Sequence, residues 1–342
     1  MHTRLAGTLA VISLLQTGSV ISAADQPAAP DDVRPAIRWA IPLLEAGSAG
    51  SADQRKCFTC HNQALPVVAL CEARRRGFDI NAENLERQIR HTEEHLKRGR
   101  KSYLEGRGQG GRVITAGYAL WALEASEFEP DETTTSVTTY LLRYQNDKDR
   151  WSHPGQRPPS SGSDFTTTYV ALRSLAVYGT DEQSDAVRDR IAKVRSWVLE
   201  TEPADMEDRV FRLRSLPYLD SDSKVVQQAV DDLLGLQQDD GGWAQTDKLA
   251  SDAYSTATVL VALLRDSDLS ADHPAIRNGV QYLLEHQKDD GSWHVATRAK
   301  PFQTYFESGF PHGKDQFISI TASSWATTAL LLTLPEEAAE LD

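Results

Sequence analysis

The sequence has very few cysteines and, beyond its first two dozen residues, no long apolar run. Its 342 residues include three cysteines, Cys57, Cys60 and Cys71. Three cysteines are too few for a disulfide scaffold, so a fold of this size depends on a hydrophobic core. No later segment approaches the roughly 20 consecutive apolar residues of a transmembrane helix. The sequence therefore predicts a globular protein without a membrane span.

The first 24 residues have the composition of a secretory signal. Arg4 precedes an apolar run from Leu5 to Leu15, and small residues follow near Ala23 and Ala24. We expect residues 1–24 to be a signal peptide and residues 25–342 to be a single exported domain, located in the periplasm. The formal net charge of −13 disfavours nucleic acid and anionic membranes as partners, because both repel an acidic protein.

Three segments repeat one pattern, in which a Leu-Leu pair leads to a Gln with a Trp six residues later. A second apolar run, containing an Ala-Leu pair, follows each segment. Each unit therefore reads as an amphipathic helix, a loop and a more apolar helix. The repeated segments are Tyr140–Trp151 (YLLRYQNDKDRW), Asp232–Trp243 (DLLGLQQDDGGW) and Tyr282–Trp293 (YLLEHQKDDGSW).

The spacing of the Ala-Leu pairs extends this unit along the chain. Similar pairs at Ala69-Leu70 and Ala119-Leu120, with Ser215-Leu216 as a degenerate copy, bring the number of units to about six. One set of helices is apolar all round and the other has a polar face, which indicates two concentric layers. We therefore predict an all-α fold, an α/α toroid of about six helical hairpins and twelve helices.

The segment from Gln237 to Trp243, repeated from Gln287 to Trp293, resembles the QW repeat of the squalene cyclase and protein prenyltransferase superfamily. That resemblance implies an α/α toroid in which the Gln and Trp tie each outer helix to its neighbour. The later segment from Trp293 onwards also looks like that of exported squalene-cyclase-like bacterial proteins, which often carry a C-x-x-C-H segment. The fold does not by itself carry the activity.

The C-x-x-C-H segment of Cys57, Cys60 and His61 lies between the two helices of the first unit. In an exported protein this spacing is typical of covalent haem c, with two thioether bonds and His61 as the proximal iron ligand. Closure of the ring places the sixth unit beside the first. We therefore expect His312, and next His294, as candidates for the second axial ligand, and a redox protein as a possible partner.

Three other interpretations of this segment stay open. Zinc could bind Cys57, Cys60 and His61 together with a fourth group, although the adjacency of Cys60 and His61 makes joint ligation awkward. A disulfide could join the two cysteines, leaving a toroid without catalytic activity that binds a lipid, peptide or glycan. An internal thioester between Cys60 and Gln63 would resemble that of complement-type thioester domains.

Acidic residues from Asp205 to Asp208 (DMED) suggest a different chemistry. Cyclases of the resembled superfamily protonate an alkene with an Asp-x-Asp-Asp motif, and here Glu207 stands where the family has its central Asp. Asp205, Glu207 and Asp208 are thus candidate acids for a terpenoid cyclase or transferase. A solvated loop is the alternative. The length also counts against cyclisation, because those cyclases place their substrate between two toroids and this chain has room for one.

The sequence thus favours an exported toroid with haem c at Cys57, Cys60 and His61, acting in electron transfer or haem chemistry. The terpenoid enzyme using Asp205, Glu207 and Asp208 is the second hypothesis. A binding toroid with a disulfide is the third. Each allows a small-molecule or lipid-like ligand.

Overall fold

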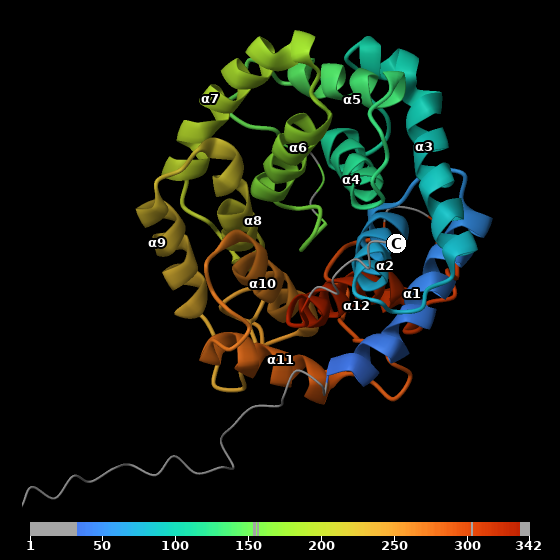
Figure 1. Ribbon diagram of the computed structural model, residues 1–342, viewed down its shortest axis with the longest axis vertical. Coiled ribbons are helices and arrows are strands. Elements are labelled where there is room, and N and C mark those ends of the chain that lie inside the picture. The colour runs from blue at the N-terminus through green and yellow to red at the C-terminus, as the bar shows by residue number, and fades with distance from the viewer. Residues whose placement is uncertain (1–32, 153–154, 156, 302–303, 336–342) are drawn as a thin grey trace, which may run out of the picture.

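The structure is a computed structural model that describes residues 33–152, 155, 157–301 and 304–335, so the predicted signal peptide at 1–24 lies outside the described residues. The described part contains twelve α-helices arranged as successive hairpins (Figure 1). Their bounds are α1 Val33–Gln54, α2 Leu65–Arg75, α3 Ala82–Leu104, α4 Arg112–Ala125, α5 Glu132–Arg143, α6 Asp164–Tyr178, α7 Ser184–Glu200, α8 Met206–Ser215, α9 Ser223–Leu234, α10 Ala253–Asp266, α11 Pro274–His286 and α12 Gln316–Leu332.

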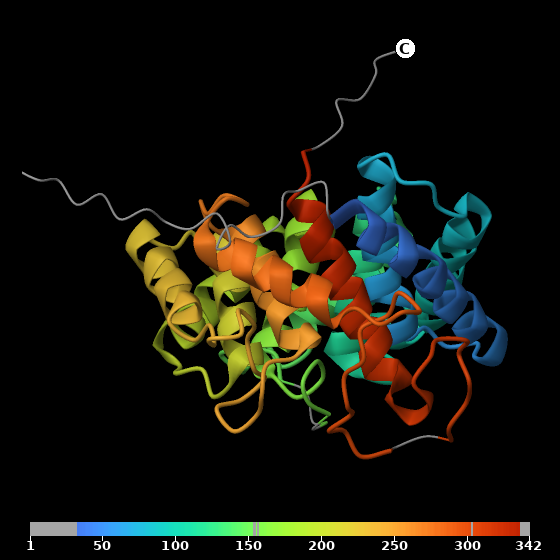
Figure 2. The same cartoon turned by 90° about the horizontal axis from the view of Figure 1, so that it is seen from below.

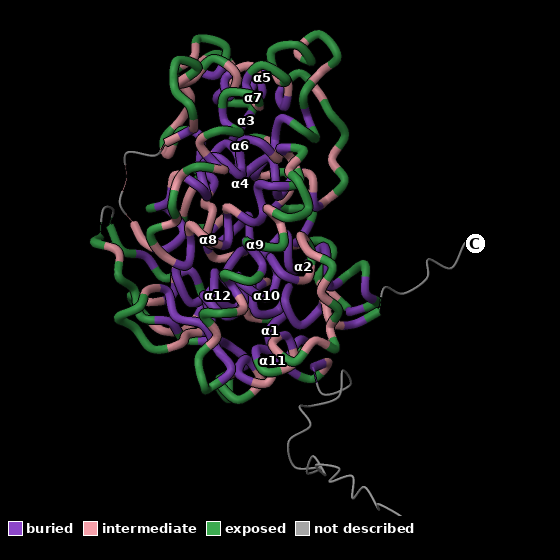
Figure 3. The backbone as a smooth tube through the Cα atoms, turned by 90° about the vertical axis from the view of Figure 1, so that its left-hand side faces the viewer, coloured by how far each residue is buried: buried purple, intermediate pink, exposed green. Residues whose placement is uncertain are grey.

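The even-numbered helices form an inner ring and the odd-numbered helices surround it (Figure 1). Each inner helix packs on the next, and α12 packs against α2, so the ring is closed. The Ala-Leu pairs found in the sequence lie buried on the inner helices, as at Ala119-Leu120 and Ala329-Leu330. Burial follows the two layers, with buried backbone inside and exposed backbone at the rim (Figure 3). The predicted α/α toroid is confirmed.

The repeated Trp residues have one structural role. The indole Nε1 of each donates to the backbone oxygen of the leucine ten residues earlier, at 2.9 Å for Trp151 and 2.7 Å for Trp243 and Trp293. All three side chains are fully buried, and the bond satisfies the polar atom of an otherwise apolar group. Each Trp thus fixes the loop that follows an outer helix onto that helix.

Two of the three repeated Gln residues join neighbouring units, whereas Gln145 bonds to Ser152 within its own loop. Gln237 Nε2 donates to the backbone oxygens of Gly241 and of Ala275 on α11. Gln287 Nε2 donates in the same way to Gly291 and to the backbone oxygen of Ala36 on α1, at 2.9 Å. The role implied by the family resemblance therefore holds for Gln237 and Gln287, and Gln287 fastens the last unit to the first.

The two ends of the ring differ in charge. All inner helices run in one direction, and the long loops from outer to inner helices lie together at the end of their N-termini, which we call the mouth (Figure 2). Asp205 and Asp252 cap α8 and α10 there. The other end, which we call the base, collects basic residues of the inner helices, since the helix dipole favours acids at N-termini and bases at C-termini. These are Arg75, Arg76, Arg173, Arg214 and Arg265.

No helix among the described residues is both long and apolar enough to cross a membrane.

Candidate active site at the mouth of the ring

Glu207 is the deepest carboxyl of the acidic segment. Asp205 caps α8 by accepting from the backbone N–H of Asp208 at 3.1 Å, and this cap turns Glu207 toward the ring interior, where it is only 4% exposed. Thr166 Oγ1 on α6 donates to Oε1 at 2.8 Å, and the Tyr254 hydroxyl on α10 donates to Oε2 at 2.9 Å. Glu207 is thus held between two neighbouring inner helices by hydroxyl groups.

Burial controls the protonation of this carboxyl. It raises the pKa of Glu207 to about 8, and the charges of Asp205 and Asp208 add to the rise, whereas the two hydroxyl donors oppose it. At neutral pH Glu207 therefore carries a proton. A buried carboxylic acid kept protonated by its surroundings is suited to donate that proton, and the segment is not the solvated loop that the sequence left as an alternative.

The other two acids of the segment face away from the interior. Asp208 accepts from Ser163 Oγ at 2.6 Å and from the backbone N–H of Ala204 at 2.9 Å. Asp205 is half-buried, and burial, followed by the charge of Asp208, raises its pKa. Both therefore support Glu207 electrostatically, by making its ionised form less favourable.

The cysteine loop reaches the same mouth from the first unit. Cys60 Sγ lies 3.9 Å from Thr115 Oγ1 on α4, and the Nε2 atom of His61 lies 3.1 Å from Ser160 Oγ. Burial and the charge of Arg157 lower the pKa of His61 to about 4, so its imidazole is neutral. The two candidate sites of the sequence are thus at one end of the ring.

Tyr118 is a buried residue of α4 that interacts electrostatically with both groups. Burial raises the pKa of its hydroxyl well above its usual value, and the charges of Glu207 and Cys60 contribute to the rise. A single buried side chain therefore senses both the acidic segment and the cysteine loop.

The two cysteine side chains of this loop differ in exposure. Cys57 is exposed and Cys60 is half-buried, while Phe58 between them is buried with its ring 5.9 Å from that of His95. The thiols of Cys57, Cys60 and Cys71 are all unpaired. The Gln63 amide accepts from the backbone N–H of Thr59 and donates to Gln88, as an intact side chain does.

His294 and His312 pair with each other. Their ring centroids are 4.6 Å apart, and their hydrogen bonds go to Asp315 Oδ2 and Ser292 Oγ respectively. Neither of these bonds leads to the cysteine loop. No group of three or more His, Cys, Asp or Glu side chains in the described ranges is placed to hold a metal ion.

Four rings form a layer beneath Glu207. Trp121, Tyr169, Phe211 and Trp325 come from four inner helices, with neighbouring centroids 5.2 to 6.5 Å apart. The Arg214 guanidinium faces all four, at 4.7 to 5.8 Å from the centroids. Its Nε bonds to Asp266 Oδ2 at 3.1 Å. The centre of the ring is therefore filled by a cation of the protein itself.

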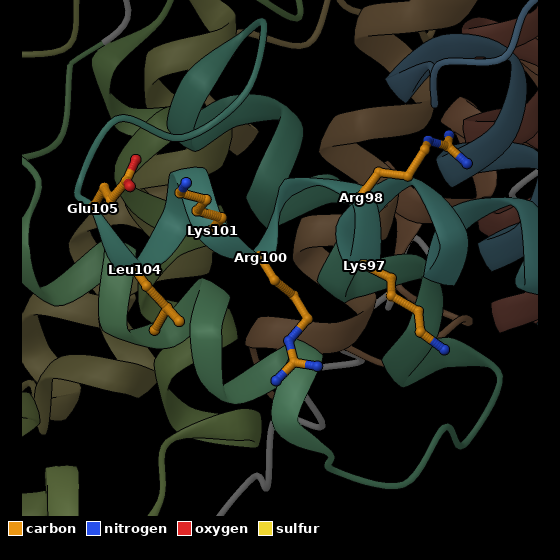
Figure 4. Close-up of a pocket in the computed structure, with 6 residues that line it drawn as sticks. All are labelled: Lys97, Arg98, Arg100, Lys101, Leu104 and Glu105. Atoms are coloured by element: carbon orange, nitrogen blue, oxygen red, sulfur yellow. The ribbon is translucent and has the colours of Figure 1, made fainter.

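A hollow on the outer surface is unrelated to this site. It lies on one face of α3, and the side chains that line it diverge into solvent (Figure 4). Arg98 and Arg100 in this hollow already bond to Lys56 O and Glu132. Its lining is Lys97, Arg98, Arg100, Lys101, Leu104 and Glu105.

Sequence reasoning missed the partners of Glu207. Thr166 and Tyr254 occupy the first turn of inner helices, among many apolar and hydroxyl residues. Their position near the start of a helix could have indicated them, because every inner helix begins at the mouth, where the acidic segment lies.

Comparisons with known proteins agree with this architecture. Residues 208–326 match the family described as squalene-hopene cyclase C-terminal domain. The chain is a squalene-cyclase-like α/α toroid. The squalene-hopene cyclase of Bradyrhizobium diazoefficiens is 30% identical over a stretch that covers 30% of this toroid. The chain spans only 17% of the length of that curated relative.

Solved structures resemble this squalene-cyclase-like toroid over nearly its whole length. The type II terpene cyclase MstE from Scytonema matches with a TM-score of 0.58 and 15% identity, covering 89% of this chain and 98% of MstE. A possible member of the GH105 family from Salmonella enterica matches with a TM-score of 0.51 and 12% identity, covering 94% of this chain and 98% of that one. These likenesses establish the fold alone.

Proposed function

We propose that this toroid is a Brønsted-acid enzyme that protonates an alkene of a prenyl-type small molecule. The observation that carries the proposal is the buried carboxyl of Glu207, protonated at neutral pH and held by two hydroxyls at the mouth of the ring. A general acid must carry its proton at the working pH, and burial without a cationic partner keeps the Glu207 carboxyl protonated.

The proposed step moves one proton. The alkene π electrons form a new C–H bond with the proton of Glu207, and the electron pair of the O–H bond stays on the carboxylate. The carboxylate is stabilised by the hydrogen bonds from Thr166 and Tyr254. The resulting carbocation loses a neighbouring proton to water, or captures water and then releases a proton to solvent. Glu207 then regains a proton from the mouth side, where Asp205 and Asp208 lie.

The comparisons support this class of substrate. A variant of MstE with one substituted residue has been solved in complex with geranylgeranyl dihydroxybenzoate as substrate, at 15% identity to this chain. Because this toroid covers 98% of MstE, a chain of about this length is described as a type II terpene cyclase. The objection that one toroid is too small for such chemistry therefore falls away.

The position of Arg214 limits the substrate. Its guanidinium already faces the four rings beneath Glu207, so those rings are not free to stabilise a long folded chain of cationic intermediates. The reacting alkene must approach Glu207 from the mouth. We infer a reaction with one protonation and few ring closures.

The test is turnover in deuterated water. The protein is incubated with geranylgeranyl dihydroxybenzoate and with shorter prenyl arenes, and the products are analysed by mass spectrometry. We expect one deuterium at the protonated carbon, and a loss of at least about 100-fold in Glu207→Gln, the scale of general acid catalysis. Glu202→Gln, an exposed acid of the same loop, is the control and keeps full turnover. Equal turnover of the Glu207→Gln variant would refute the assignment.

Haem c is the second candidate, favoured by the unpaired thiols of Cys57 and Cys60 and the neutral imidazole of His61. As placed, these residues do not fit a haem: Cys57 is exposed whereas Cys60 is half-buried, and the Nε2 atom of His61 bonds to Ser160. Attachment, or zinc binding by the same groups, requires this loop to refold. No step proposed above passes through either.

Expression with the haem-attachment machinery tests this candidate. Covalent haem predicts visible absorption that survives denaturation, with a mass increase of one haem that Cys57→Ala abolishes. A colourless protein of unmodified mass excludes it, together with a role in electron transfer to a redox partner. The same expression in a bacterium, followed by fractionation, tests export to the periplasm, the location we propose for this protein.

A further inference from the structure

Three buried polar atoms beneath Glu207 have no hydrogen-bond partner in the protein. They are the Tyr118 hydroxyl, Trp325 Nε1 and Arg214 Nη1. Each of these side chains is 1% exposed. Buried polar groups are nearly always bonded, and an unpaired one costs about 1–3 kcal/mol, so three together need an explanation.

The three atoms belong to side chains that surround one aromatic residue, Trp121. Trp121 stacks with Tyr118 at 5.8 Å between centroids and contacts Trp325 at 5.7 Å. The Arg214 guanidinium lies 5.1 Å from the Trp121 centroid and 5.4 Å from that of Trp325. The Tyr118 hydroxyl is also near enough to Arg214 for its charge to affect the pKa of Tyr118. The three side chains that carry these atoms therefore all lie around Trp121 inside the helical ring.

The chemistry of these atoms defines what they can bind. The indole N–H and the guanidinium N–H groups can only donate, so their missing partner is an acceptor. Asp266, the carboxylate that neutralises Arg214, is bonded to Nε, which leaves Nη1 without an acceptor. Glu207, directly above, carries a proton at neutral pH and adds no negative charge. These side chains thus offer hydrogen-bond donors and the positive charge of Arg214, which together suit an anionic acceptor.

We propose that the toroid binds a small monovalent anion, a carboxylate or a halide, between Tyr118, Trp325 and Arg214. A guanidinium edge and an indole N–H bind a planar carboxylate through its two oxygens and bind a halide as a simple ion. The site is separate from alkene protonation, because none of its three donors bonds to Glu207, and its binding is measured without any turnover.

Isothermal titration of the full chain with sodium formate, sodium acetate and sodium bromide tests this site. Binding of formate or acetate with bromide silent assigns a carboxylate, and binding of bromide assigns a halide. Crystals grown with sodium bromide should show an anomalous peak within hydrogen-bond reach of Trp325 Nε1 and Arg214 Nη1. Absence of binding for all three salts, or density for water alone at this position, overturns the proposal.

Variants separate the site from its surroundings. Trp325→Phe keeps an aromatic side chain and removes the indole N–H donor. We expect the dissociation constant of the anion to rise about tenfold, the effect of one lost hydrogen bond. Arg214→Met should abolish binding but leaves Asp266 unpaired and endangers the fold, so Trp325→Phe carries the test. Tyr305→Phe, on the exposed surface, is the matched control and keeps wild-type affinity. Unchanged affinity in Trp325→Phe contradicts the proposed contacts.

Discussion

Two glutamates of the inner ring are equally buried and have opposite protonation behaviour. Glu72 at the base and Glu207 at the mouth are each 4% exposed. Glu72 contacts Arg75 at 2.9 Å, Arg76 at 2.7 Å and Arg265 at 2.8 Å. Burial raises its pKa, but these hydrogen bonds and charges outweigh burial and lower the pKa of Glu72 to about 2. The pKa of Glu207, whose partners are hydroxyls, rises to about 8.

The difference teaches that the partners of a buried carboxyl decide its chemistry. Both side chains lose water to a similar degree, and only Glu72 gains cations in exchange. The helix dipole alone would give the opposite order of the two pKa values, because it favours a charged carboxylate at the N-terminal mouth, where Glu207 lies. Desolvation without a cation therefore outweighs the dipole. The base therefore holds a charged carboxylate, whereas the mouth keeps a carboxyl protonated.

Removing the charge at the base has the largest expected effect. Glu72→Gln leaves three arginines without their shared carboxylate, and we expect a loss of roughly 3–5 kcal/mol in the free energy of unfolding, as for other broken buried ion pairs. Denaturant titration measures it. Glu86→Gln, in an exposed pair with Arg90 on α3, should change stability by less than about 1 kcal/mol. Similar small losses in both variants would remove the distinction drawn between the two ends.

The pH dependence of stability separates the two glutamates next. Glu207 has a folded pKa of about 8, above its usual 4.5, so the folded state keeps a proton that the unfolded state loses as pH rises. Stability therefore falls between these two values. Glu207→Gln lacks this loss, and between pH 4 and pH 9 it should gain on the order of 4 kcal/mol relative to the wild type. Parallel stability profiles of the two proteins would contradict a protonated Glu207.

Glu72 shows the reverse sign. Its folded pKa of about 2 lies below the usual 4.5, so its contribution is complete above 4.5 and is lost as pH falls toward 2. The free energy of unfolding should fall between pH 6 and pH 3 in the wild type and should change less in Glu72→Gln. An equal loss in both proteins would mean that other carboxyls cause the acid sensitivity.

The smallest effect concerns one hydroxyl. Thr166→Val keeps the shape of the side chain and removes one donor to Glu207, so the pKa of Glu207 should rise further above its present value. Carbon-detected NMR titration of the glutamate carboxyls measures this shift. Thr167→Val, equally buried on the same helix with its hydroxyl on the Ser163 backbone oxygen, should leave the pKa of Glu207 unchanged.

The fold was predictable because its signals are local and repeated. A Leu-Leu pair, a Gln and a Trp recur within twelve residues. The bonds of Trp243 to Leu233 and of Gln237 to Gly241 both lie within such a segment. The candidate site was predictable only in part. Asp205, Glu207 and Asp208 look alike in sequence, and only the packing of α6 and α10 around α8 buries Glu207 alone.

The cysteine loop illustrates the same limit. The spacing of Cys57, Cys60 and His61 is a local signal, but the side on which each group lies depends on contacts from other units. Phe58 packs on His95 of α3, and His61 meets Ser160 of the third unit. A short motif does not encode such long-range contacts, so its interpretation as a cofactor site stays a prediction.

The bond from Gln287 to the first helix has a consequence for biosynthesis. During translation α1 emerges early, yet the backbone oxygen of Ala36 finds its partner only when residue 287 has been made. Until then the nascent chain is an open arc with two unfinished edges. Contacts between residues this distant in sequence slow folding, so we expect the unclosed arc to be the form that most needs a chaperone.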